Sequence, residues 1–165
     1  MPTVDDIYLG NPNLKKANTE IEFTQEQILE FMACKADPVY FAKKYIKIVS
    51  LDEGLVPFDL YPFQEKLISN FHENRFNICK MPRQTGKSTT SVSYLLHYAV
   101  FNDNVNIGIL ANKAATARDL LGRLQTAYEN LPKWMQQGII SWNKGSLELE
   151  NGSKILAAST SASAV

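Results

Sequence analysis

The segment Met81-Pro-Arg-Gln-Thr-Gly-Lys-Ser88 constrains the fold of this chain more than any other feature. It matches the phosphate-binding pattern G-x-x-x-x-G-K-[ST] except at the first position, where Met81 replaces glycine. In this pattern the second glycine lets backbone N–H groups approach phosphate oxygens without a Cβ in the way. A helix that begins directly after the loop directs the positive end of its dipole at the same oxygens. The segment therefore predicts a phosphate-binding loop between a strand and a helix, and the alternative is an ordinary surface turn that starts a helix.

The flanking sequence predicts alternating strands and helices. Residues 76–81 form a short apolar run that indicates a buried strand, and a helix is expected from Ser88 to about Val100. Residues 105–111 are nearly continuously apolar, as in strands of parallel sheets, and a helix is expected from there to about Tyr128. This order is typical of an α/β fold with a parallel sheet.

Three short strands are expected after that point, at residues 139–142, 146–150 and 154–158. The turns Asn143-Lys144-Gly145 and Asn151-Gly152 separate them, and Asn-Gly between alternating runs is a strong hairpin signal.

Residues 1–23 are polar and predict a flexible arm. The capping-box sequence Thr24-Gln25-Glu26-Gln27 then predicts a helix, Pro38 a second short helix, and Pro62 a third amphipathic one. Residues 46–49 are expected to be extended and residues 52–59 to form a loop.

Composition excludes several classes of protein. Hydrophobic residues make up 45% of the 165 residues and charged residues 21%, which excludes a disordered or collagen-like chain. No apolar run approaches the ~20 residues of a membrane span, and no secretion signal is recognisable, so we expect a soluble intracellular protein. Cys34 and Cys79 lack metal-ligand spacing, and Cys79 is expected to be a core thiol.

The net charge of zero conceals an uneven distribution. Residues 1–75 contain 8 Lys/Arg against 12 Asp/Glu, whereas residues 76–165 contain 9 against 5. A basic second half suits a phosphate partner, although scatter of surface charge explains it equally well.

The loop residues fit specific tasks at a nucleotide. The Lys87 ammonium would bind β- and γ-phosphates, and the Ser88 hydroxyl would be a ligand of Mg²⁺. Arg83 would stabilise charge at the γ-phosphate, unless it is a solvated loop residue. Gln64, in Tyr61-Pro-Phe-Gln64, would read an adenine edge because its amide both donates and accepts, with Phe63 or Tyr61 packed on the ring; the alternative is an ordinary exposed helix residue.

From about Thr24 to the last residue, the chain resembles the N-terminal ATPase region of the large terminase subunit of tailed bacteriophages, the motor that packages DNA, and most closely that of contractile-tailed phages. The motifs that support this resemblance are, in order, Asp37-Pro-Val-Tyr-Phe-Ala42, Tyr61-Pro-Phe-Gln64, Pro82-Arg-Gln-Thr-Gly-Lys-Ser-Thr89, Ile107-Gly-Ile-Leu-Ala-Asn-Lys113 and Trp142-Asn-Lys-Gly-Ser-Leu-Glu-Leu-Glu-Asn-Gly-Ser153.

The resemblance implies a P-loop NTPase fold of the RecA-like (ASCE) type, with flanking helices, a small helical region before the sheet and an antiparallel hairpin at the end. It implies a division into a flexible arm (1–23), a helical N-terminal subdomain (24–60) and the first part of the ATPase domain (61–165).

The resemblance also implies ATP and Mg²⁺ as ligands. Arg83 and Lys87 would be catalytic and Ser88 the metal ligand. The nucleotide-binding set would be Gln64, Pro82, Arg83, Gln84, Thr85, Gly86, Lys87, Ser88 and Thr89.

The implied partners are double-stranded DNA, the portal protein of the prohead and the small terminase subunit. A homo-oligomeric ring on the portal, a location in the host cytoplasm and no contact with membranes are implied as well.

No strand of this chain ends in the Asp-Glu pair that ATP hydrolysis needs, so we expect an N-terminal fragment, inactive alone, that lacks the Walker B acids and the C-terminal nuclease domain. Two other interpretations remain at this point, a helicase-like P-loop ATPase and a fragment that binds nucleotide without hydrolysing it.

Overall fold

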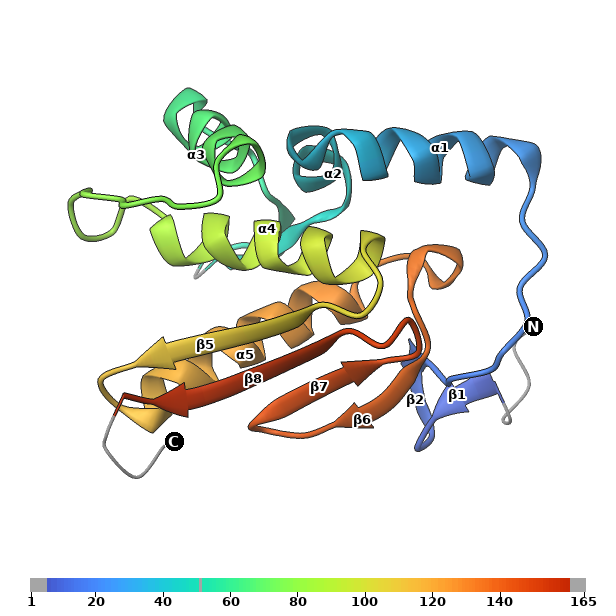
Figure 1. Ribbon diagram of the computed structural model, residues 1–165. Helices are drawn as coiled ribbons and strands as arrows, with labels where there is room; N and C mark the ends of the chain where they lie inside the picture. Colours follow the sequence, from blue (N-terminus) through green and yellow to red (C-terminus); the bar gives the residue numbers. More distant parts are fainter. Residues whose placement is uncertain (1–5, 51, 161–165) are drawn as a thin grey trace.

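A computed structural model describes residues 6–50 and 52–160 of the chain (Figure 1). Its helices lie where the sequence predicts them. Their bounds are α1 Gln25–Ala36, α2 Pro38–Tyr45, α3 Pro62–Glu73, α4 Lys87–Phe101 and α5 Ala114–Glu129, followed by the short 3₁₀ helix η2 Lys133–Met135. The predicted capping box of α1 is present: Thr24 Oγ1 accepts from Gln27 N at 3.2 Å, and Gln27 Oε1 accepts from Thr24 N at 3.0 Å.

Four strands of the described residues form a mixed sheet, the largest sheet in this part of the chain. Its strands are β5 Asn106–Ala111, β6 Ile139–Trp142, β7 Ser146–Leu149 and β8 Lys154–Ser159. Their order is β5-β8-β7-β6, with β5 and β8 parallel and the other neighbours antiparallel. The expected α/β class and the expected hairpins are thus confirmed, whereas the expected parallel sheet is a mixed one.

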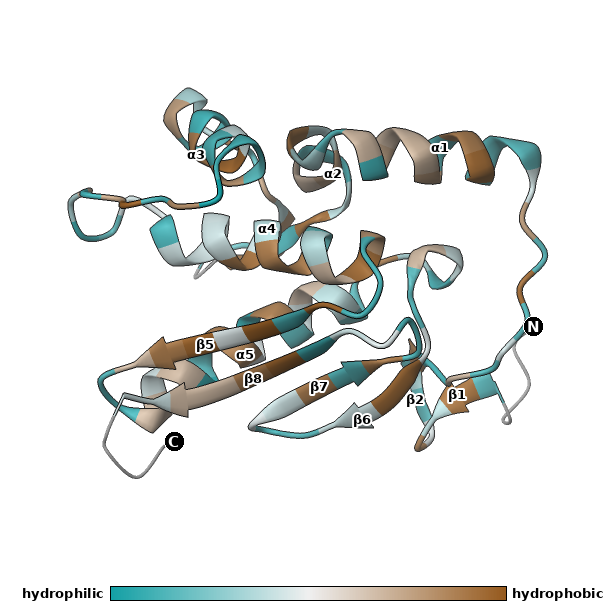
Figure 2. Cartoon of the chain, in the orientation of Figure 1, coloured by the Kyte–Doolittle hydropathy of each residue, from teal (hydrophilic) through white to brown (hydrophobic). Residues whose placement is uncertain are grey.

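The two faces of this sheet differ in burial. Helix α5 lies against β5 and β8, behind the sheet in Figure 1. Alternate side chains point to that covered face, among them Ile107, Ile109 and Ile155, and all three are buried. Leu110 and Leu156 lie on the opposite face and are exposed. Both faces of β5 and β8 carry hydrophobic residues, drawn brown in Figure 2, so burial and not hydropathy distinguishes the two faces.

The expected strand at residues 76–81 is absent, and this prediction was wrong. The segment runs into the loop without strand geometry, Phe76 is 83% exposed and Ile78 100% exposed. A strand forms where a neighbour satisfies its N–H and C=O groups. No strand within residues 6–50 and 52–160 pairs with this segment.

The N-terminal residues also differ from the flexible arm that the sequence predicts. Strands β1 Ile7–Tyr8 and β2 Asn11–Lys15 form a hairpin, and Leu14 is buried in the core. Lys16 forms a parallel bridge with Ile139, so this segment lies along the outer edge of β6. Residues 1–5 of the expected arm lie outside the described part of the chain.

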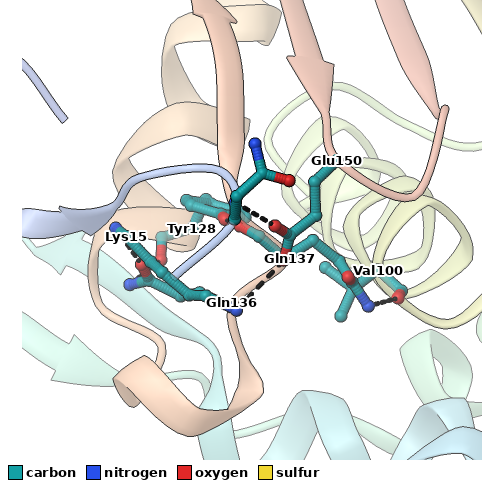
Figure 3. Close-up of polar contacts among 7 residues, drawn as sticks. Lys15, Val100, Tyr128, Gln136, Gln137 and Glu150 are labelled. Atoms are coloured by element: carbon teal, nitrogen blue, oxygen red, sulfur yellow. Dashed lines mark hydrogen bonds and ion pairs between the residues drawn. The ribbon is translucent and has the colours of Figure 1, made fainter. Parts of the chain in front are cut away.

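Side chains far away in the sequence hold this hairpin in place (Figure 3). The Gln136 amide accepts from Lys15 N at 3.0 Å and donates to Asn13 O at 2.9 Å. The Lys15 ammonium pairs with Glu150 at 3.0 Å. These contacts join residues more than a hundred positions apart, which local sequence patterns do not reveal.

Strands β3 Lys47–Ser50 and β4 Gly54–Pro57 form a second hairpin. The extended segment at 46–49 is thus confirmed, whereas the expected loop at 52–59 contains a strand. Helices α1 and α2 pack on the end of α4, where the ring of Phe41 contacts those of His97 and Phe101 at centroid distances of 5.4 Å each. One contiguous core joins these helices to the sheet.

No helix within the described residues is long and apolar enough to cross a membrane.

Candidate functional site

The loop between residue 81 and α4 has the backbone shape that its glycine allows. Gly86 is the N-cap residue of α4 and has φ +75°, in the left-handed region. A Cβ at this position would lie 2.4 Å from Gln64 Nε2. The dihedral angle favours glycine at residue 86, and any larger residue there would also displace the Gln64 amide.

Gln64 faces the loop from the first turn of α3. Its side chain is buried, its Oε1 accepts from Tyr61 N at 2.9 Å, and its Nε2 donates to Thr85 O at 3.2 Å. One N–H and one lone pair of the amide remain for another partner. Gln64 thus connects α3 to the loop directly before α4.

The Lys87 side chain turns back into the loop. Its ammonium donates to Met81 O at 3.2 Å and also to Pro82 O. Thr85 Oγ1 donates to Pro82 O as well, at 3.0 Å. The positive charge is consequently held inside the turn that residues 81–87 form.

The remaining predicted site residues lie around this turn. Arg83, Gln84 and Ser88 are exposed, and Thr89 is half-buried in the first turn of α4. Gln84 has φ +62°, so the loop contains two left-handed residues. Eight of the nine predicted site residues thus lie in the continuous segment 82–89, and the ninth, Gln64, reaches this segment from α3.

Thr90 is a contributor that the sequence reasoning missed. It is fully buried, and its Oγ1 donates to Gly86 O at 3.0 Å, next to the Thr90 N–H bond to the same oxygen at 2.9 Å. The run Ser88-Thr89-Thr90 contains three hydroxyl residues, and only the helical geometry tells which one bonds back to the loop.

Two aromatic rings lie beside this site. Tyr61 and Phe63 are stacked, with ring centroids 5.7 Å apart and an interplanar angle of 7°. They are 65% and 45% exposed at the N-terminal end of α3, next to Gln64. Each ring covers part of the other, and the remaining apolar surface of the pair is open to solvent.

Other side chains that could carry chemistry are accounted for by their surroundings. Cys79 is exposed, so the expectation of a core thiol was wrong, for the same reason as the missing strand. Glu148 pairs with Lys154 at 2.8 Å, and Glu150 pairs with Lys15. Within the described ranges, no group of three His, Cys, Asp or Glu side chains could hold a metal ion.

His97 is a core residue. It is 2% exposed, its Nε2 lies 2.9 Å from Cys34 O, and its Nδ1 has no hydrogen-bond partner among the described residues. Burial lowers the pKa of His97 from 6.5 to about 4, so the ring is neutral near pH 7.

The fold and this loop together define an α/β protein with a Gly-Lys-Ser turn at the start of a helix. A family model described as the N-terminal part of the terminase large subunit, T4likevirus-type, matches residues 78–164. This range is more than half of the chain and includes the whole turn, so the chain belongs to that family of viral DNA-packaging terminases. The family inferred from the sequence motifs is thereby confirmed, on a match that includes the motifs from residue 82 onward.

Proposed function

We propose that this chain binds MgATP at residues 82–89 and is the first part of a terminase large subunit whose ATP hydrolysis drives double-stranded DNA into a prohead. The observation that supports this most is the Lys87 ammonium, which is held inside the loop at the N-terminus of α4. Membership of the terminase family supplies the biological setting.

The residues present fit a triphosphate. Gly86 leaves the loop backbone open, and the 15-residue helix α4 begins immediately after it, with free N–H groups in its first turn. Lys87 would exchange its two loop carbonyls for phosphate oxygens. The Ser88 hydroxyl is exposed in the same turn and would be a ligand of Mg²⁺. These features support our proposal that the loop is the P-loop of a RecA-like (ASCE) NTPase.

The base would lie on the α3 side of the loop. The exposed faces of Tyr61 and Phe63 suit a planar ring, and the free N–H and lone pair of Gln64 suit an adenine edge. Because the same amide also donates to Thr85 O, a base bound to Gln64 would influence the position of the loop.

When bound, ATP supplies the phosphoryl group whose transfer to water releases the energy for movement. Arg83 is exposed within the loop and would reach the γ-phosphate. The acidic residues that position the attacking water are expected outside this chain, so the chain alone should bind ATP without turnover.

The first experiment is isothermal titration of MgATP into the chain and into Lys87→Ala. We expect the substitution to lower affinity by about 100-fold, since charge-assisted bonds to phosphate are lost. The thermal midpoint without nucleotide should stay unchanged, because the ammonium bonds only loop carbonyls. Lys113→Ala, at the exposed residue before α5, is the matched control. Equal affinity in both variants would contradict the proposal.

Arg83→Ala separates binding from turnover and is to be made in the full-length enzyme. We expect MgATP affinity to be retained while the hydrolysis rate falls by roughly 10³-fold, as for arginines that act on a transferring phosphoryl group. An equal loss in affinity would instead make Arg83 an anchor for the nucleotide.

The portal protein, the small terminase subunit and a homo-oligomeric ring on the portal are proposed as further partners of the full-length protein, in the host cytoplasm. This part of the proposal rests on family membership alone. Co-sedimentation of the full-length protein with purified portal rings tests it.

A further inference from the structure

A cavity of about 300 Å³ lies between the β3–β4 hairpin and the helices α4 and α5. Five of the ten described residues that line it are apolar, and three of these, Ile46, Val92 and Ala127, are buried. None of the loop residues 82–88 lines it. The cavity is therefore separate from the proposed nucleotide site, although Thr89 of α4 is part of its wall.

A buried polar group without a partner faces this cavity. Ser93 is 1% exposed and lines the cavity, and its Oγ has no hydrogen-bond partner within the described residues. Buried hydroxyls in native proteins are nearly always hydrogen-bonded, so Ser93 Oγ is available to donate to a polar atom of a molecule bound in the cavity.

The charge around the cavity is positive. Lys47 and Arg123 are exposed and belong to its wall, and none of the ten described residues that line it is acidic. Arg123 also pairs with Asp119 at 3.0 Å, one turn earlier on α5, but both side chains are more than half exposed. Such a solvent-exposed pair is weak and leaves the guanidinium available to a second anion.

We propose that this cavity is a binding site for a small organic anion with an apolar body, such as an aromatic carboxylate or sulfonate. The apolar wall would take the body, Lys47 and Arg123 would attract the charge, and the Ser93 hydroxyl would donate to an oxygen. Its volume lies at the lower end of the range for small-molecule sites, which are typically apolar with a few polar groups. The proposal does not depend on the proposed ATP site.

The probe for this site is 8-anilinonaphthalene-1-sulfonate, whose fluorescence rises in an apolar environment. We expect saturable binding of one molecule per chain, weakened several-fold between 50 mM and 500 mM salt. Octanoate also combines an anionic head group with an apolar body, although it has no rings, and it should displace the probe. Binding without saturation, or without displacement, would overturn the proposal.

Three variants assign binding to the cavity. Arg123→Gln should weaken binding about tenfold without affecting the fold, since the side chain is exposed. Ser93→Ala should weaken binding while leaving the thermal midpoint equal or higher, because an unpaired buried hydroxyl is removed. Ala127→Leu should abolish binding by filling the cavity, and its fold is to be checked by circular dichroism.

Leu29→Lys and Leu110→Lys are the controls, since both leucines are exposed apolar residues far from this wall that would also attract the probe. Neither should change the saturable binding. If these two variants abolish it and Arg123→Gln does not, the probe binds exposed surface and the cavity is not a site for anions.

Discussion

Two apolar segments flank α4, and only the second of them forms a strand of the sheet. The segment before the helix, residues 76–81, has no strand partner among the described residues and exposes Phe76 and Ile78. The segment after it is β5, which pairs in register with β8 from Asn106 to Ala111 and buries Ile107 and Ile109. The two segments have similar composition, so hydrophobicity alone does not make a strand. A neighbour that satisfies the backbone is the second requirement.

This difference separates the residues that stabilise the fold from those that shape the loop for ligand binding. The loop is held by a few hydrogen bonds, among them those from Gln64 to Thr85 O and from Thr90 to Gly86 O, rather than by a strand in the sheet. Substitutions in β5 and β8 should therefore change stability, whereas those in the loop and in the segment before it should change ligand binding.

The largest effect is expected for Ile155→Ala in β8. Ile155 is fully buried and pairs with Ile107 across the parallel ladder. Removing its side chain should lower the free energy of unfolding by about 3 kcal/mol, from lost burial and the cavity left behind. Urea denaturation of the 165-residue chain measures this change.

Leu156→Ala is the matched control, because Leu156 follows Ile155 in the same strand but is 58% exposed on the opposite face. Its effect should stay below about 1 kcal/mol. A loss equal to that of Ile155→Ala would mean that the open face of the sheet is covered in solution.

The second largest effect is expected for the pH dependence of stability, which depends on His97. This residue lies among aromatic rings at the end of α4 on which α1 and α2 pack. Its pKa is lowered from 6.5 to about 4, so the unfolded chain binds a proton between these values and the folded chain does not. The free energy of unfolding should consequently fall as the pH decreases from about 6.5 to about 4, by at most about 3 kcal/mol from this group. Above pH 6.5 the ring is neutral in both states, and this dependence disappears.

His97→Gln tests the assignment. The variant should be less stable at pH 7, because a buried ring is lost, but its stability should depend less on pH over the same interval. His72→Gln removes an exposed imidazole whose ring centroid lies 6.2 Å from that of His97 and whose charge helps to lower the pKa of His97, so this variant should reduce the dependence without abolishing it. An unchanged slope in His97→Gln would show that other groups cause it.

Local sequence signals were sufficient for most of the fold. The capping box at Thr24, the proline that starts α3 and the Asn-Gly turn before β8 each specify a local geometry, and each lies where predicted. The glycine and lysine of the loop were identified by the same kind of signal. All of these depend on residues within a few positions of one another.

The sequence did not reveal the features that depend on distant contacts. Gln136 and Glu150 hold the β1–β2 hairpin in place, and no local pattern at residues 11–15 predicts these partners. The contact between Gln64 and Thr85 spans 21 positions, and it gives the glutamine a role in positioning the loop that its motif alone did not suggest. The exposed segment at 76–81 was misassigned because its composition is that of a strand, while strand formation depends on a neighbour.

The smallest effect is expected for the unpaired segment itself. Phe76→Ser and Ile78→Ser replace side chains that are 83% and 100% exposed, so each should change the free energy of unfolding by less than about 0.5 kcal/mol. Ile109→Ser in β5, where the side chain is 6% exposed, should cost several times more.

Amide hydrogen exchange provides a second measurement: residues 76–81 should exchange at nearly the rate of a free peptide, and β5 should be protected through its bonds to β8. Protection of residues 76–81, together with a large loss in Ile78→Ser, would mean that this segment does pair in solution and that the two segments are alike after all.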